Sequence, residues 1–234
     1  MQLGTLPEAM PVLPGYDMHG TFLPAQQTGG DTYDLALSER GLLVVLGDAA
    51  GHGIAPALSV TQMHAMLRMA LRLGADLETA FRQVNDLLAD TLRDGRFVTA
   101  CIGLLDPASH RLRLLSGGQA PLLHFHAAGG GSTAHRATSF PMGAAPIRTL
   151  RPALEIDLAP GDWLVLITDG VYEYESPTGE QFGKARIEQL IYQHHAGTPL
   201  SLSGHVLKAV KLFADGAPQE DNITMVLLKR LPLA

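Results

Sequence analysis

Residues 41–53, GLLVVLGDAAGHG, constrain the fold of this chain more than any other segment. The apolar run from Leu42 to Leu46 is too short for a typical helix and is bounded by glycines, so it predicts a buried strand. Asp48 follows at the point where the strand ends and a glycine-rich turn begins, and glycines there permit positive φ and the close approach of another group. An apolar core has no use for a carboxylate at this point, whereas a metal ion or a charged ligand would require one.

The composition of the 234 residues provides ample material for a core, since 46% are hydrophobic and 17% are charged. We expect a single domain over residues 1–234, with residues 1–14 as an irregular segment or the end of a linker. The net charge of −6, without a run of lysine or arginine, argues against a nucleic-acid or anionic-membrane surface. The sequence shows neither a membrane-spanning run nor a signal peptide, so a cytoplasmic location is expected. The lone Cys101 is expected to be a buried core residue.

Strands grouped by short turns, with helices arriving in pairs, indicate a layered α+β fold. Helices are expected at residues 54–73, 77–92, 184–194 and 201–213, and Asp76 is a suitable N-cap for the second. Strands are expected at residues 16–23, 31–37, 42–46, 97–105, 111–115, 122–126, 154–158, 163–168 and 223–228. The glycines at 129–131 predict a flexible surface loop. The first helix carries a narrow polar stripe made of Thr61, His64, Arg68 and Arg72.

Four aspartates share one kind of position. Asp31 and Asp221 open strands, and Asp48 and Asp169 close apolar strands before a glycine turn. If the strand ends meet on one rim of a sheet sandwich, four carboxylates there repel one another until they are protonated or bind divalent cations. Oxygen-only ligation selects hard ions, Mg²⁺ or Mn²⁺. An aspartate beside a glycine is more often a turn former, so the prediction depends on the four acids together.

Zinc is not predicted, because no cluster of cysteine and histidine is visible along the sequence. The pair His194 and His195 near a helix end is interpreted as part of a solvated surface. The Gly-Gly-Asp of residues 29–31 could suggest a diguanylate cyclase, but Thr and Tyr follow where that motif has Glu and Phe. That assignment would also leave the downstream acids without a role.

The acids lie in a set of motifs that resembles the metal-dependent (PPM-type) protein serine/threonine phosphatases, and within them the SpoIIE/RsbU branch. The matching segments are residues 29–34 (GGDTYD), 47–53 (GDAAGHG), 160–170 (PGDWLVLITDG) and 221–224 (DNIT). They occur in order and span nearly the whole chain. The resemblance implies an α-β-β-α four-layer sandwich, in which two antiparallel sheets are flanked by helices and metals bind at one rim.

The resemblance also implies roles for individual residues. Asp48 should bridge two Mn²⁺ or Mg²⁺ ions, Asp169 and Asp221 should complete the first site, and Asp31 and the Ala49 carbonyl should serve the second. The ions would hold a water and lower its pKa, so that it attacks the phosphorus of phosphoserine or phosphothreonine in line. Asp48, Asp169 and Asp221 are then catalytic through this metal-activated water.

In this branch the usual substrates are phosphorylated STAS-domain regulators of the anti-anti-sigma type, in bacterial signal transduction. In this branch the phosphatase domain usually follows a sensor or receiver domain, so the resemblance is compatible with an isolated catalytic domain as well as with a stand-alone phosphatase. It is also compatible with a homodimer. We also expect the helices at 54–73 and 77–92 to couple partner or dimer contacts to metal binding, because the first follows directly from the Asp48 turn. The alternative function is a phosphatase-like binding module that sequesters a regulatory partner with little turnover.

The sequence departs from the wider phosphatase family in two respects. Residues 1–30 contain no arginine to bind the substrate phosphate, and the spacing from Asp48 to His52 is longer than in the aspartate-glycine-histidine motif of that family. Binding of the substrate phosphate must then depend more on the metals, or on an arginine from elsewhere in the chain such as Arg68, Arg72 or Arg96. His52 is a candidate general acid, although a turn residue is the preferred interpretation. Asp34 is a candidate for a third, weaker metal site, and a structural role that caps a turn is preferred. Asn222 and Thr168 are expected to hold the ligands by hydrogen bonds.

Overall fold

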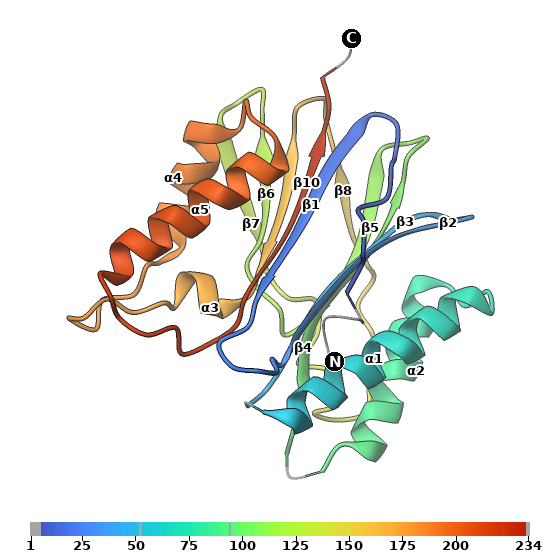
Figure 1. Cartoon of the computed structure of the whole chain (residues 1–234). Coiled ribbons are helices and arrows are strands. Elements are labelled where there is room, and N and C mark those ends of the chain that lie inside the picture. Colours follow the sequence, from blue (N-terminus) through green and yellow to red (C-terminus); the bar gives the residue numbers. More distant parts are fainter. Residues whose placement is uncertain (1–5, 52, 94, 233–234) are drawn as a thin grey trace.

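The computed structural model describes residues 6–51, 53–93 and 95–232. Two five-stranded antiparallel sheets pack face to face, with helices on both outer faces (Figure 1). The expected α+β class and the α-β-β-α arrangement of layers are thereby confirmed.

The first sheet, sheet A, carries the last strand of the chain near its centre. Its strands, in spatial order, are β1 (Tyr16–Leu23), β10 (Ile223–Arg230), β9 (Trp163–Ile167), β6 (Leu122–His126) and β7 (Gly131–His135). The second sheet, sheet B, contains the apolar run of residues 42–46. Its strands, in spatial order, are β2 (Asp31–Ser38), β3 (Gly41–Ala49), β4 (Val98–Asp106), β5 (Arg111–Gly117) and β8 (Leu154–Asp157).

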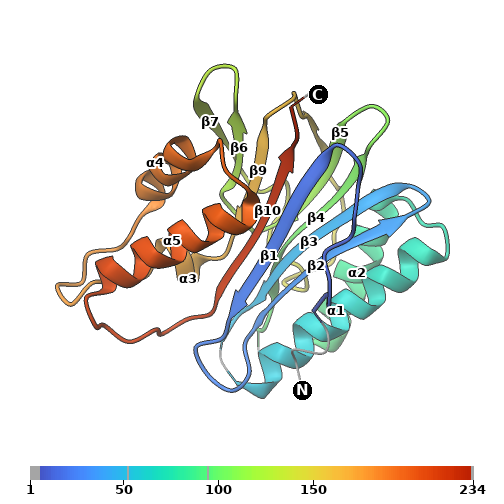
Figure 2. The ribbon, with the colours of Figure 1, turned by 45° about the horizontal axis from the view of Figure 1, so that its top comes forward.

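Helices cover the outer face of each sheet (Figure 2). Sheet B is covered by α1 (Ile54–Arg72) and α2 (Leu77–Thr91), and sheet A by α4 (Lys184–His194) and α5 (Pro199–Ala214). The short α3 (Asp169–Tyr172) follows β9 directly. Asp76 caps α2 as expected, because its carboxylate accepts a hydrogen bond from the Thr79 amide at 2.7 Å.

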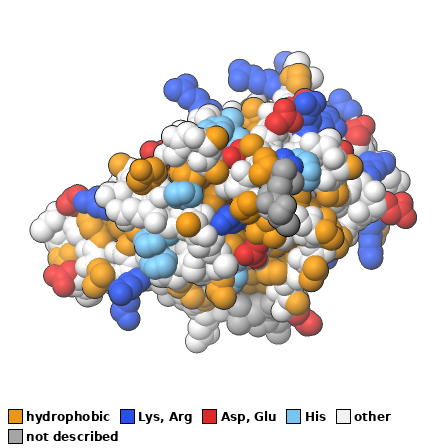
Figure 3. Space-filling view, turned by 90° about the horizontal axis from the view of Figure 1, so that it is seen from above, with side chains coloured by type: hydrophobic (Ala, Val, Ile, Leu, Met, Phe, Trp, Pro, Cys, Tyr) orange, Lys and Arg blue, Asp and Glu red, His pale blue; other side chains and the backbone are white. Residues whose placement is uncertain are grey.

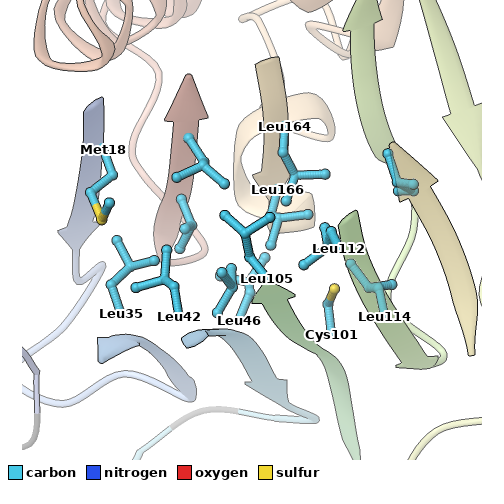
Figure 4. Packing of buried hydrophobic residues seen from close by; sticks show 14 of the residues in the cluster. Met18, Leu35, Leu42, Leu46, Cys101, Leu105, Leu112, Leu114, Leu164 and Leu166 are labelled. Carbon is cyan, nitrogen blue, oxygen red and sulfur yellow. The ribbon is translucent and has the colours of Figure 1, made fainter. Parts of the chain in front are cut away.

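The apolar run of β3 has a simple explanation in this architecture, because both faces of the strand are buried. Leu42, Val44 and Leu46 belong to the core between the sheets, while Leu43 and Val45 pack with α1 and α2. Figure 4 shows Leu42 and Leu46 pointing toward side chains of the opposite sheet. A strand that is apolar on both faces reads as a continuous run rather than an alternation.

Two elements were not expected from the sequence. Strand β7, GSTAH, is small and polar because it lies at the edge of sheet A and is largely exposed. The glycines at 129 and 130 form the turn that joins β6 to β7, so the predicted flexible loop is a hairpin connection whose last glycine begins the strand. The short helix α3 was missed because its four residues are too few for a helical period.

The polar stripe expected on α1 is only partly exposed. His64 is buried and lies 2.8 Å from the Asp34 carboxylate on β2, which also forms an ion pair with Arg68 at 3.2 Å. These contacts fasten the first helix to the sheet. Cys101 is buried, as predicted. None of the helices in the described ranges is long and apolar enough to cross a membrane.

Candidate metal centre

Asp31 and Asp48 face each other across two neighbouring strands. In the register of β2 and β3 they are direct partners, at the end of sheet B where β3 runs into the turn before α1. Like charges directly opposite each other on antiparallel strands are destabilising. The pairing therefore places two mutually repelling carboxylates at one rim of the sandwich.

The other two acids come to the same rim from sheet A. Asp169 begins α3 immediately after β9, and Asp221 lies two residues before β10, the neighbour of β9 in the sheet. Gly170 allows the two segments to approach, since a Cβ added there would lie 2.0 Å from the Asn222 carbonyl oxygen. Asp169 and Asp221 line a cleft of about 510 Å³, together with Glu173, Glu175 and Glu220.

Hydrogen bonds join the two sheets at this rim. The buried Asp31 of sheet B accepts a hydrogen bond from the Thr168 hydroxyl at 3.0 Å and another from the Thr224 hydroxyl, both of sheet A. Asn222 accepts a hydrogen bond from the Ala25 amide at 3.2 Å, which holds the loop before β2 against the rim. Thr168 thus bonds to one of the expected ligands, whereas the side chain of Asn222 bonds to the Ala25 amide instead. Thr224 was not predicted from the sequence.

The electrostatics show that the four acids act on one another. The pKa of Asp31 is raised well above its usual range, first by burial and then by the charge of Asp48. The pKa of Asp48 is raised to about 7, by burial and then by Asp169 and Asp221. The pKa of Asp169 is also raised, by burial and by Asp221. Neutralising this cluster requires protons or cations.

The donor set fits a hard divalent cation. It consists of four carboxylates with the Ala49 backbone beside them, where the Ala49 amide donates to the Gly30 carbonyl at 2.9 Å. Gly30 packs so closely that a Cβ would lie 2.7 Å from the Ala49 carbonyl oxygen. Oxygen donors with a high negative charge are the ligands of Mg²⁺ and Mn²⁺.

The metal-free protein should therefore lose stability as the pH rises. The folded-state pKa of Asp48, about 7, lies above the usual value of about 3.9. The folded state consequently binds a proton more tightly than the unfolded state, and this stabilisation, on the order of a few kcal/mol, is complete below pH ~4 and lost as the pH passes through ~7. Urea unfolding in EDTA from pH 5 to 8.5 measures it. The decrease of the unfolding free energy with pH should be smaller in Asp48→Asn, and also in the unmodified chain when saturating Mn²⁺ replaces EDTA. An unchanged decrease in both cases would contradict the proposed repulsion among the four acids.

The structure removes three other candidates from this rim. Asp34 lies within β2 and binds His64 and Arg68, so it neither caps a turn nor faces the cluster. Arg68 and Arg72 lie about 21 Å or more along α1 from the start of the helix, beyond the reach of a side chain. The remaining arginine, Arg96, precedes Phe97, whose carbonyl accepts from the Ala50 amide at 3.1 Å. His52 lies outside the described residues.

The fold brings together a group of possible metal ligands that is not visible as a cluster along the sequence. His124, His126 and Asp162 place one ligand atom each within 4.8 Å of one another. Part of this group could have been found from the sequence, because His124 and His126 are two residues apart in a strand and therefore lie on the same face of the sheet. The third member is 36 residues beyond His126, so only the fold brings it there. By contrast, His194 stacks on His205 of the neighbouring helix with ring centroids 3.7 Å apart, and His205 is exposed.

Known proteins resemble this chain in sequence and in fold. The protein IcfG of Synechocystis sp. is 28% identical over 268 residues, an alignment that covers 98% of this chain and 40% of IcfG. The phosphoserine phosphatase RsbU of Bacillus subtilis is 19% identical, with 92% of this chain and 63% of RsbU covered. The solved RsbU and RsbW domains of Rv1364c from Mycobacterium tuberculosis superpose with a TM-score of 0.82 at 24% identity, covering 98% of this chain and 64% of that one.

The chain thus spans only 40% to 64% of the length of these three relatives. The family model for Stage II sporulation protein E matches residues 38–231, from the last residue of β2 to the residue after β10. This match includes three of the four aspartates and extends over more than half of the chain. On this basis the chain belongs to the Stage II sporulation protein E (SpoIIE) family.

Proposed function

We propose that this chain is a Mn²⁺- or Mg²⁺-dependent protein serine/threonine phosphatase. The observation that carries the proposal is the convergence of Asp31, Asp48, Asp169 and Asp221 from both sheets on one rim beside an open cleft. The relationship to a phosphoserine phosphatase supports the reaction class. The activity is phosphoric monoester hydrolysis at phosphoserine or phosphothreonine.

Asp48 would be the ligand common to both proposed ions, because it interacts with each of the other three acids. Asp169 and Asp221 would help to hold one ion, and Asp31 with the Ala49 carbonyl would help to hold the other. Bound divalent ions would lower the pKa of a coordinated water and offset charge on the transferring phosphoryl group. Thr168 and Thr224 keep Asp31 aimed at the rim through their hydroxyl groups.

The phosphate can be bound by the metals alone or by a cation of the protein as well, and Arg96 is the residue that we assign to the second case. Arg96 adjoins Phe97, whose carbonyl bonds to the Ala50 amide near the rim. Arg68 and Arg72, by contrast, lie far along α1 from the rim. Glu173, Glu175 and Glu220 make the adjoining cleft acidic, so it favours basic residues on the peptide that carries the phosphate.

The substrate that we propose is a phosphorylated STAS-domain regulator, in keeping with a role in bacterial partner switching. The single domain over residues 1–234, a sensor or receiver domain upstream, a homodimer and a cytoplasmic location are proposed with it. Helices α1 and α2 remain the proposed coupling element. The reason is that α1 begins shortly after Ala49 and contacts β2 through the bonds from His64 and Arg68 to Asp34.

Phosphate release tests the proposal. The chain should hydrolyse a generic aryl phosphate with excess Mn²⁺ and lose this activity in EDTA. Phosphorylated STAS protein and an unrelated phosphoserine protein should then be compared under the same conditions. Hydrolysis of the unrelated protein alone would remove the STAS assignment, whereas metal binding without hydrolysis of any of the three would favour the binding module.

A further inference from the structure

A second group of metal-ligand side chains lies at the opposite end of sheet A from the aspartates. His124 and His126 lie on β6, and Asp162 immediately precedes β9. Because β9 separates Asp162 from the rim beyond Ile167, the two groups are about 20 Å apart along the strand direction. The turn between β6 and β7 is at the top of Figure 1, and the view from there shows histidine side chains at the surface (Figure 3).

Asp162 is held in position by the backbone around it. One carboxylate oxygen accepts from the Ala127 amide at 2.9 Å, and the other accepts from the Ala159 amide at 3.0 Å. The second oxygen, Oδ2, also lies 2.9 Å from Nε2 of His124. Asp162 and His124 are both buried. The carboxylate is therefore preorganised by two amides, independently of any cation, and the ring of His124 is directed at it.

A second imidazole, that of His126, lies near the same carboxylate oxygen. Its Nε2 lies 2.8 Å from the Thr133 hydroxyl, and its Nδ1 lies 4.0 Å from Oδ2 of Asp162. The rings of His124 and His126 have centroids only 4.1 Å apart. Thr133 can orient this ring in the way that a neighbouring hydrogen-bonding group orients a metal-ligating histidine.

A third imidazole lies beside this pair. His135 stacks near His124 with ring centroids 6.3 Å apart, and its Nε2 is buried without a hydrogen-bond partner among the described residues. Two imidazoles near one carboxylate, with a third beside the first of them, exceed what a turn needs for its own hydrogen bonds.

We propose that His124, His126 and Asp162 bind Zn²⁺, with His135 as the nearest further donor. Nε2 of His124 and Nδ1 of His126 lie 2.9 Å and 4.0 Å from Oδ2 of Asp162. These two distances bracket the roughly 3.3 Å between ligands of a tetrahedral ion with bonds of about 2.0–2.1 Å. The ion would take the place of the hydrogen between His124 and Asp162. Imidazole and carboxylate donors suit Zn²⁺, whereas the all-oxygen rim suits Mg²⁺ and Mn²⁺. A bound ion would tie the turn before β9 to the exposed edge hairpin.

The test titrates the chelator-treated full chain with Zn²⁺ and Co²⁺, in an Asp48→Asn background that weakens the acidic rim. We expect one Zn²⁺ per chain, the visible absorption of four-coordinate Co²⁺, and a higher Tm with Zn²⁺. His126→Ala should weaken Zn²⁺ binding at least tenfold and remove the Co²⁺ absorption. The side chain of His126 is 43% exposed, so its truncation leaves the fold intact. His126→Gln is the second variant, and circular dichroism checks the fold of both.

His205→Ala is the matched control, because the stacked pair of His194 and His205 on α4 and α5 is the competing histidine site in the described structure. Unchanged Zn²⁺ binding in His205→Ala, with loss in the His126 variants, supports the proposal. Absence of Zn²⁺ binding overturns it, as does binding that survives both His126 variants. Loss of binding in His205→Ala would likewise overturn it and assign the ion to the surface pair.

Discussion

Asp48→Asn is expected to reduce kcat/KM for a phosphoserine protein by about a thousandfold or more in saturating Mn²⁺. Metal ions contribute several kcal/mol to stabilising the charge of the transition state, and each ~1.4 kcal/mol is a factor of ten in rate. Asp48 interacts with Asp31, Asp169 and Asp221, so its loss weakens both proposed sites together. Initial rates of phosphate release, with Mn²⁺ binding measured in parallel, check the prediction.

A loss of activity through unfolding can be separated from this effect, because the same substitution should stabilise the metal-free protein. Asparagine keeps the shape of the side chain and removes the charge that burial and the neighbouring acids disfavour. At pH 8 in EDTA, Asp48→Asn should therefore resist urea better than the unmodified chain. Activity within about tenfold of the unmodified enzyme would contradict the assignment of Asp48 as the shared ligand.

The layered fold and most of its elements could be predicted from local patterns. The run at Leu42–Leu46 and the run at Trp163–Ile167 indicated strands buried on both faces, and the structure places each inside its sheet with packing on both sides. The N-cap of α2 could be predicted because aspartate, here Asp76, is a preferred residue at that position. Such features depend on neighbours in the sequence, so the sequence displays them directly.

Side-chain partners that are distant in the sequence could not be predicted in the same way. Thr224 binds Asp31 across 193 residues, and His124 binds Asp162 across 38. Each contact depends on which strands become neighbours and in which register. His64 was interpreted as part of a polar stripe for the same reason, since its partner Asp34 lies on a strand that only the tertiary fold brings under α1. The placement of four acids at strand ends was visible, but their mutual contact required both sheets.

Gly170→Ala is expected to damage the rim without removing a charge. The new Cβ would lie 2.0 Å from the carbonyl oxygen of Asn222 and 2.9 Å from its carbonyl carbon. Both are backbone atoms, so no side-chain rotation relieves the clash, and the segments that carry Asp169 and Asp221 must separate. Overpacking of this kind costs about 1–3 kcal/mol of stability. A displacement of about 1 Å in a catalytic group can cost on the order of a hundredfold in rate.

The expected result for Gly170→Ala is thus a chain that folds, binds Mn²⁺ more weakly and hydrolyses phosphoserine about a hundredfold more slowly even in saturating metal. Gly204→Ala is the matched control, because that glycine lies in α5 with open space where the new Cβ would sit, and it should gain up to about 1 kcal/mol of stability with unchanged activity. Mn²⁺ titration, urea unfolding and phosphate release on both variants distinguish the effects. If Gly170→Ala lost stability but kept full activity and Mn²⁺ affinity, the spacing between Asp169 and Asp221 would not matter to the reaction, and these two acids would not hold a common ion.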